Sequence, residues 1–317
     1  MKILITGITG FVGSHLVEFL LKKGGQEIYG LKRWRSPLTN IKEILHNVTL
    51  LNGDLRDSAS MNRLISEIRP ERIFHLAAQS YVPTSFTAPT DTIETNVNGT
   101  INLLEAVRNA KINPKIHICS SSEVYGQVSE DELPIKETNP FRPQSPYAIS
   151  KVGEDLFGFQ YFKSHGLQTI TSRAFTHTGP RRGEVFVVSA FAKQIAEIEA
   201  GKQEPILRHG NLESVRTFLD VRDIVKAYDL LLEKCEPGEA YNIGGDVHMK
   251  IKDMLDMLLE MSDKKIELVQ RQSLLRPSDV TLQIPDVSKF KDATGWKPEI
   301  PFKQTLKDTL DYWRERV

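Results

Sequence analysis

Cysteine is scarce in this sequence of 317 residues, which contains two, Cys119 and Cys235. They lie far apart and lack the close spacing that is typical of metal-binding cysteines or of a disulfide framework. A soluble chain of this size with so few cysteines is typical of a reducing compartment. We therefore expect a cytoplasmic protein with no metal site.

Long apolar runs and an excess of charge of one sign are also missing. No run approaches the roughly 20 apolar residues needed to span a bilayer. The apolar start of the chain is interrupted by Thr6, Gly7 and Thr9, unlike the core of a signal peptide. Lys plus Arg and Asp plus Glu number 41 each, so no overall field attracts nucleic acid or an anionic membrane. The partner we expect is a small molecule.

Apolar strands alternate regularly with helical segments through the first half of the chain. Segment 92–110, for example, carries apolar residues at helical spacing, and a long helix is expected near 145–164. Such alternation predicts a parallel sheet covered on both faces, an α/β fold of the Rossmann-type, doubly wound class. The expected strands are residues 2–6, 27–31, 48–54, 72–78, 115–121 and 169–175.

The pattern of predicted elements changes after about residue 176. The loop "THTGPRRGEVF" is followed by shorter segments with turn signals such as "HGNLES" and "IGGD". We predict a nucleotide-binding Rossmann domain over residues 1–176 and a smaller α+β substrate lobe mainly over 177–317. Some of the later elements are expected to return to the main sheet.

Three glycines follow the first strand and open a helix. In "TGITGFVG", Gly7 allows a tight turn, Gly10 lets a pyrophosphate approach the backbone, and Gly13 allows close packing of helix on strand. The helix N-terminus adds free N–H groups and a partial positive charge. The alternative, glycines that serve only a turn, is less consistent with this strand–turn–helix setting.

Arg33 ends the second strand, in "GLKRWRS", where NAD-binding folds place an acidic residue for the ribose hydroxyls. A guanidinium there would bind a 2′-phosphate, which favours NADP over NAD; a solvated basic turn is the alternative. In "NGDLRD", Asp54 and Leu55 would reach the adenine rim. Asp57 is predicted to cap the next helix.

Tyr147 and Lys151 lie four residues apart in "SPYAISK", on one face of a predicted helix. Beside a nicotinamide, the charge of Lys151 would lower the pKa of the Tyr147 phenol. The phenol would then accept a proton from a sugar hydroxyl near neutral pH. An ordinary helix face is the alternative reading of this pair.

The chain resembles the extended short-chain dehydrogenases/reductases that act on nucleotide sugars. The motifs that carry this resemblance span most of its length: "TGITGFVG", "GDLRD", "HLAAQS", "NVNGT", "SSSEVYG", "YAISK", "VRDIVKAY", "YNIGG" and "GWKP". Within that group, "RPQSPYAISK", "GPRRGEVFV", "GNLESVR" and "LRPSDV" are similar to stretches of the GDP-mannose 4,6-dehydratases and the related GDP-4-keto-6-deoxymannose reductases.

The resemblance implies roles for the residues after the fifth strand. Ser121 and Tyr147 would bind the C4 hydroxyl of the sugar, with Tyr147 as the base. Glu123 would remove the C5 proton and assist loss of water from C6. Elimination needs this additional acid/base group, whereas reduction or epimerisation at C4 does not. A carboxylate held at the strand end by a helix N-terminus or by serine hydroxyls is the structural alternative for Glu123.

The resemblance also implies the binding sets. The cofactor residues would be Gly7, Thr9, Gly10, Phe11, Val12, Gly13, Arg33, Asp54, Leu55, Leu76, Ala77, Ala78, Tyr147, Lys151, His177 and Arg182. The substrate residues would be Ser85, Ser122, Thr176, Val187, Lys193, Arg216 and Arg276, the last two on a diphosphate. Arg182 would alternatively reach a neighbouring subunit, and Lys193 would alternatively be a solvated charge.

Some features depart from the dehydratase pattern. Thr176 stands where an Asn is usual, and "RTF" replaces "RDF" at Thr217. The chain length is closer to that of the reductases, so we expect a homodimer. The leading hypothesis is a dehydratase acting on GDP-mannose or a GDP-manno-heptose. A 4-ketoreductase or C4 epimerase remains open, and a non-catalytic NADP-binding sensor is the remaining alternative.

Overall fold

Seven parallel strands form the centre of the computed structural model, which describes residues 1–275 and 278–317. They are β1 (Lys2–Thr6), β2 (Glu27–Lys32), β3 (Thr49–Asn52), β4 (Arg72–His75), β5 (Lys115–Cys119), β6 (Gln168–Ala174) and β10 (Ala240–Ile243). Their order in the sheet is β10-β6-β5-β4-β1-β2-β3, and each neighbouring pair is parallel. This order confirms the predicted Rossmann-type fold.

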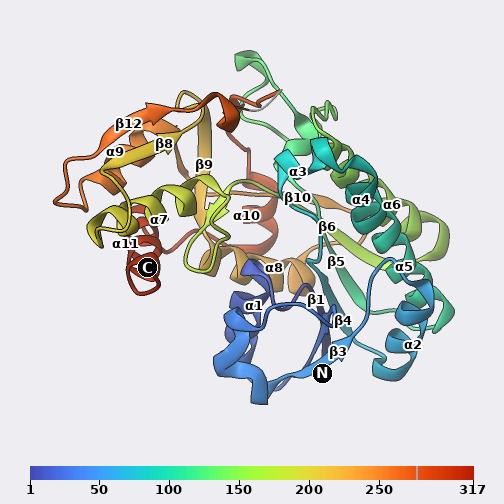
Figure 1. Cartoon of the computed structure of the whole chain (residues 1–317). Coiled ribbons are helices and arrows are strands. Elements are labelled where there is room, and N and C mark those ends of the chain that lie inside the picture. The colour runs from blue at the N-terminus through green and yellow to red at the C-terminus, as the bar shows by residue number, and fades with distance from the viewer. Residues whose placement is uncertain (276–277) are drawn as a thin grey trace.

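Helices cover both faces of this sheet (Figure 1). One face carries α1 (Phe11–Lys23), α8 (Val221–Lys234) and α10 (Ser288–Thr294), and the other carries α2 (Ser58–Ile68), α5 (Gly99–Asn109) and α6 (Pro146–His165). Because strand side chains alternate, Ile3 and Ile5 of β1 pack on the first face and Leu4 on the second. Both layers are therefore apolar, as expected of a buried parallel strand.

Short helical turns lie on the loops at the edge where the strands end. Between β4 and α5 the chain forms α3 (Val82–Thr87), α4 (Pro89–Ile93) and a π-helical turn, η2 (Glu94–Asn98). Such π turns occur frequently at functional sites. The 3₁₀ turns are η1 (Thr39–Asn47), η3 (Ser122–Tyr125), η4 (Glu130–Glu132) and η5 (Gln272–Leu274).

The C-terminal part of the chain has its own apolar cluster. A four-stranded sheet joins β7 (His177–Thr178), β9 (Val215–Asp220), β11 (Val247–Lys250) and β13 (Leu282–Gln283); a parallel pair joins β8 (Ile206–His209) and β12 (Glu267–Gln270). Helices α7 (Val187–Glu199), α9 (Ile251–Leu259) and α11 (Phe302–Arg314) pack with them. β10 belongs to the main sheet and α8 packs on it, so elements after residue 176 return to the first part of the chain, as expected. The division into domains at residue 176 stays a prediction.

Element ends differ from the sequence prediction in two places that matter for the site. β3 ends at Asn52 and β5 ends at Cys119, so the residues that follow each strand form loops or turns. The predicted cap is confirmed, because the Asp57 carboxylate accepts hydrogen bonds from the N–H groups of Ala59 (3.0 Å) and Ser60 (3.4 Å). Within the described ranges, no helix has the length and apolar character needed to cross a membrane.

Candidate active site

A cavity of about 500 Å³ opens beside the N-terminus of α1, where β1 to β5 end. The carboxyl edge of a doubly wound sheet is where such folds bind ligands. Of the residues predicted to hold the cofactor, those that line the cavity are Gly7, Thr9, Gly10, Phe11, Val12, Gly13, Arg33, Asp54, Leu55, Leu76, Ala77, Ala78, Tyr147, His177 and Arg182. Lys151 is the one that does not.

The glycine turn has the geometry of a phosphate cradle. Gly7 has a φ of 71°, and a Cβ there would stand 3.0 Å from the Ala77 backbone. A Cβ on Gly13 would stand 2.3 Å from the Gly7 carbonyl oxygen, so α1 approaches β1 closely only because this residue is glycine. The residues present therefore fit a dinucleotide whose pyrophosphate lies at the start of α1.

The far end of the cavity carries a cluster of charges. Arg33 lines it from the end of β2, and Asp54 lines it from the loop after β3. Arg56 donates to the Asp54 carboxylate at 2.9 Å, and this hydrogen bond lowers the pKa of Asp54. The Asp54 carboxylate is therefore charged at neutral pH and already partly paired.

Tyr147 and Lys151 share the first turns of α6, as their spacing predicts. Ser145 caps this helix through a hydrogen bond from the Ala148 N–H (3.0 Å), and Pro146 occupies its first position. Tyr147 lines the cavity. The Lys151 ammonium lies 5.9 Å from the centre of the tyrosine ring and donates to the Cys119 carbonyl at 2.8 Å.

The predicted effect of Lys151 on the pKa of Tyr147 is confirmed in direction, but it does not set the net shift. Burial raises the pKa of the Tyr147 phenol, and the opposing effects of Lys151 and of a hydrogen bond with Ser121 are smaller. Lys151 does act in the predicted direction, but desolvation of the phenolate outweighs it. With these neighbours the phenol is protonated at neutral pH.

Glu123 follows β5, as expected, but it lies on a 3₁₀ turn. It occupies the second position of η3, where Ser121 caps the turn by accepting a hydrogen bond from the Glu123 N–H at 3.2 Å. Ser121 lines the cavity, and Glu123 stands just behind it, half-buried. In the described part of the chain, its carboxylate makes neither a hydrogen bond nor an ion pair, so the alternative of a carboxylate held by serine hydroxyls has no support.

Two of the predicted substrate hydroxyls are engaged elsewhere. Ser85 is fully buried and donates to the Val82 carbonyl at 2.7 Å. Ser122 is buried and donates to the Gln283 side chain at 3.3 Å. Neither lines the cavity. Their roles on the sugar stay predictions, because each would have to exchange a hydrogen bond inside the protein for one to the ligand.

The loop after β7 brings to the cavity a cation, Arg182, whose guanidinium has no ion-pair partner among residues 1–275 and 278–317. The Arg182 guanidinium lies 3.5 Å from the centre of the Phe186 ring and 4.9 Å from that of Phe11. Burial lowers the pKa of Arg182 to about 10, and burial followed by the Arg182 charge lowers the pKa of His177 to about 4. At neutral pH this wall therefore presents one cation and one neutral imidazole, which suits an anionic ligand.

Other predicted basic residues have protein partners. Arg181, the neighbour of Arg182 in the sequence, pairs with Glu18 of α1 at 2.5 Å. Lys193 pairs with Glu184 and lies outside the cavity. The Arg216 guanidinium lies 3.3 Å from the Asp279 carboxylate.

The remaining substrate predictions lie on the segment that joins the two parts of the chain. Thr176 lies between β6 and β7, and Val187 begins α7; both are half-buried. Neither lines the cavity. Arg276 falls outside the described residues. The substrate set as a whole therefore stays a prediction.

Sequence reasoning missed several residues that line the same cavity. They include Gln79, Ser80, Asp91, Thr95 and Ser120, with Lys32, Ser36 and Arg56 at the other end. Gln79 and Ser80 directly follow "HLAA" at the end of β4. Extending the predicted cofactor set by two residues along this stretch would have included both.

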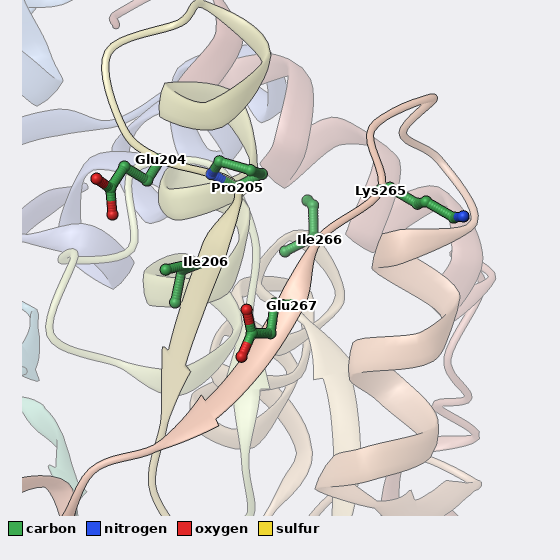
Figure 2. A pocket seen from close by; sticks show the side chains of 6 residues that line it. All are labelled: Glu204, Pro205, Ile206, Lys265, Ile266 and Glu267. Carbon is green, nitrogen blue, oxygen red and sulfur yellow. The ribbon is translucent and has the colours of Figure 1, made fainter.

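A second cavity, of about 630 Å³, lies far from this site at the start of the β8–β12 pair. Figure 2 shows Glu204 and Lys265 pointing away from each other, with Ile206 and Ile266 between them. No residue predicted to act in catalysis or binding lines it. The chemistry-bearing side chains gather at the smaller cavity.

Fold and site together define a Rossmann-type short-chain dehydrogenase/reductase. A family model described as GDP-mannose 4,6 dehydratase matches residues 4–309. The chain belongs to this family, which is a family of enzymes.

Named relatives include both activities considered from the sequence. The chain is 34% identical to the GDP-6-deoxy-D-mannose reductase of Pseudomonas aeruginosa, over 100% of this chain and 98% of the relative. It is also 34% identical to the GDP-mannose 4,6-dehydratase of Vibrio cholerae serotype O1, over 97% of this chain and 92% of the relative. The solved structure of RMD from Pseudomonas aeruginosa complexed with NADPH superposes with a TM-score of 0.87 at 33% identity, covering 100% and 99% of the two chains.

Proposed function

We propose that this protein is a nucleotide-sugar 4,6-dehydratase that converts GDP-mannose, or a GDP-manno-heptose, to the 4-keto-6-deoxy sugar. The observation that carries the proposal is the half-buried Glu123 carboxylate, which stands without a polar partner among the described residues, directly behind Ser121. Ser121 and Tyr147 face one cavity. A base, a hydroxyl and a spare carboxylate are the groups that elimination requires.

The protein groups divide the proton transfers between them. Tyr147 takes the proton of the C4 hydroxyl, which Ser121 orients, and Lys151 stabilises the charge that develops on the phenol. Glu123 removes the C5 proton, which a 4-ketone makes acidic, and passes it to the departing C6 hydroxyl. The proton held by Tyr147 returns to C5 when hydride reaches C6, which restores both groups. A nicotinamide dinucleotide bound in this cavity supplies a hydride acceptor that becomes the donor to C6, so it is regenerated within each turnover.

The cofactor we propose is NADP. Arg33 lines the cavity, and no acidic side chain precedes it at the end of β2. Arg182 provides a second cation in the lining of the cavity. The structural relative from Pseudomonas aeruginosa was solved with NADPH. A guanidinium suits the additional phosphate of NADP better than the ribose diol of NAD.

A 4-ketoreductase is the second candidate, and one observation favours it. The alignment with the reductase runs over 316 residues, whereas that with the Vibrio dehydratase runs over 348. Because this chain has 317 residues, it lacks segments that the dehydratase has. Chain length therefore points towards the reductase, and the chemistry of Glu123 points towards the dehydratase.

We further propose a homodimer formed through α6. Ile149, Leu156 and Phe159 are 52%, 51% and 48% exposed, and their spacing places them on one side of this helix. The opposite side packs on the sheet. A large apolar face on a single helix, repeated in a second copy, gives the self-complementary contact of a two-fold dimer.

The cytoplasmic location stays a prediction.

Incubation of the purified protein with GDP-mannose, without added reductant, tests the proposed reaction. We expect a GDP-linked 4-keto-6-deoxy sugar to accumulate, detected by its mass and its carbonyl. Turnover that requires both a 4-keto sugar and NADPH would instead identify the reductase.

A further inference from the structure

Lys151 has a buried carboxylate partner that the proposed mechanism does not use. Glu154 lies one helical turn further along α6, and its carboxylate is 3.0 Å from the Lys151 ammonium. The side chains are 4% and 1% exposed. Neither residue lines the cavity, whereas Tyr147 does.

The contacts of the ammonium fix its orientation. A lysine ammonium has three N–H donors. One donates to the Cys119 carbonyl at 2.8 Å and one to Glu154 at 3.0 Å. With two N–H groups fixed by these hydrogen bonds, the third N–H of the ammonium can point in one direction only. Glu154 therefore helps to set the orientation of the Lys151 ammonium.

Among the described residues, the Glu154 carboxylate has one polar partner, the Lys151 ammonium. Its Oε1 makes no hydrogen bond among the described residues, so the Lys151 ammonium is the one polar group it contacts. A buried ion pair of this kind is often no more stabilising than apolar side chains of the same volume. A buried ion pair that adds little stability and lies beside a reacting group points to a role in the reaction.

We propose that Glu154 is a positioning residue whose buried charge keeps Lys151 protonated and oriented and limits the pull of Lys151 on the Tyr147 phenol. This inference rests on the proposed roles of Tyr147 and Lys151. Burial acts to lower the pKa of Lys151, and the charges of Glu154 and Tyr147 raise it above its ordinary value. Burial also raises the pKa of Glu154 to about 7, against the opposing effect of Lys151, so this carboxylate carries its charge above that pH, where Tyr147 and Lys151 lose their protons. Burial raises the pKa of Tyr147, Lys151 opposes this, and Glu154 adds a smaller upward contribution.

The other titratable groups around the pair do not replace Glu154. Burial lowers the pKa of His75 and of His117 to about 3 each, so both are neutral at pH 7. Burial raises the pKa of Cys119, so this thiol is neutral as well. Asp155 is paired with Arg173 at 2.8 Å. The remaining neighbours of Tyr147 are Tyr228 on α8 and the cation Arg182.

The Glu154→Gln variant tests the proposal through pH. Removing a neighbouring negative charge lowers the pKa of both Tyr147 and Lys151. Activity rises as Tyr147 loses its proton and falls as Lys151 loses its own, so both limbs of the kcat profile should move to lower pH. We expect a shift of about one unit, the effect of one charge at this range. Glu67→Gln, which removes a carboxylate from an exposed i,i+4 pair on α2, should leave the profile unchanged.

Titration of ¹³C-labelled tyrosine by NMR gives a readout that needs no substrate. The Tyr147 signal, assigned by its loss in Tyr147→Phe, should titrate about one unit lower in Glu154→Gln. If the amide variant does not fold, Glu154→Met removes the same charge without a polar group. Unshifted limbs and an unshifted Tyr147 signal in the folded variant would overturn the inference. Absence of GDP-mannose turnover in the wild type would overturn the proposed function but leave this titration decisive.

Discussion

At the scale of single residues, the site is a set of charges that differ in what they contact. The Glu123 carboxylate has no polar partner within the described chain, and the Arg182 guanidinium packs on the rings of Phe11 and Phe186. Arg181, next in sequence to Arg182, is tied to Glu18. A buried charge without a partner is costly, so Arg182 in the cavity wall is available to an anionic ligand, and Glu123, beside Ser121, is available to exchange a proton.

Glu123→Gln should abolish elimination, since the amide accepts no proton from C5. We expect kcat for GDP-mannose to fall by at least about 100-fold, the lower range for loss of a general base. NADP affinity, measured by calorimetry, should stay within about twofold of the wild type, because Glu123 does not line the cavity. Glu130→Gln, in the exposed turn η4, is the matched control. Full turnover in Glu123→Gln would make this glutamate a structural residue.

Arg33→Ala should weaken NADP more than NAD. Loss of a charged hydrogen bond to a phosphate corresponds to roughly a 10- to 100-fold increase in Kd for NADP, and NAD has no such phosphate to lose. Arg35→Ala is the control, because Arg35 packs on the exposed Trp34 ring (5.1 Å to its centre) and does not line the cavity. Equal losses for both cofactors would show that Arg33 does not select between them.

At the scale of elements, the close approach of α1 to β1 depends on a missing side chain. In Gly13→Ala the added methyl would stand 2.3 Å from the Gly7 carbonyl oxygen, so the helix must move away. Overpacking of this kind costs about 1–3 kcal/mol of unfolding free energy. The displaced helix N-terminus should also weaken NAD and NADP alike, in contrast to Arg33→Ala.

Urea denaturation and cofactor titration together check the Gly13→Ala prediction. Gly183→Ala is the control, because its added methyl would meet no atom closer than 3.6 Å. Wild-type stability and affinity in Gly13→Ala would show that α1 accommodates the methyl without moving.

The sequence predicted the elements well but not where their ends direct each side chain. Periodicity and the glycine turn were enough for the strands and for the cofactor cavity, because both depend on local pattern. The position of Glu123 depends on Ser121 capping a turn, which ends β5 early. Spacing rules do not encode tertiary contacts. They therefore could not predict that Arg182, and not Arg181, lines the cavity, or that Ser85 bonds to its own helix.

At the scale of the whole molecule, the two parts of the chain meet beside the catalytic turn. Ser122 of η3 donates to Gln283 of β13, and Tyr125 donates to Asn242 of β10 at 2.7 Å. β13 pairs with β9, the strand of Arg216. The turn that carries Glu123 is therefore tied both to the main sheet and to the proposed substrate lobe.

Leu156→Lys combined with Phe159→Lys should convert the proposed dimer to a monomer. Two charges on the exposed face of α6 would be buried in a two-fold contact, which is costly without partners. Light scattering after size-exclusion chromatography gives the mass. Val247→Lys, at an apolar residue that is 37% exposed on β11, is the control and should leave the mass unchanged. A monomeric wild type would contradict the dimer.

The central claim, that hydride leaves C4 and returns to C6 of the same sugar, is tested most directly by isotope tracing. GDP-mannose with deuterium at C4 is incubated with the protein without added reductant, and the product is analysed by NMR and mass spectrometry. The account predicts a 4-keto-6-deoxy sugar that carries the deuterium in its C6 methyl group. A 4-keto-6-deoxy product without deuterium at C6, or no product until a keto sugar and NADPH are supplied, would contradict it.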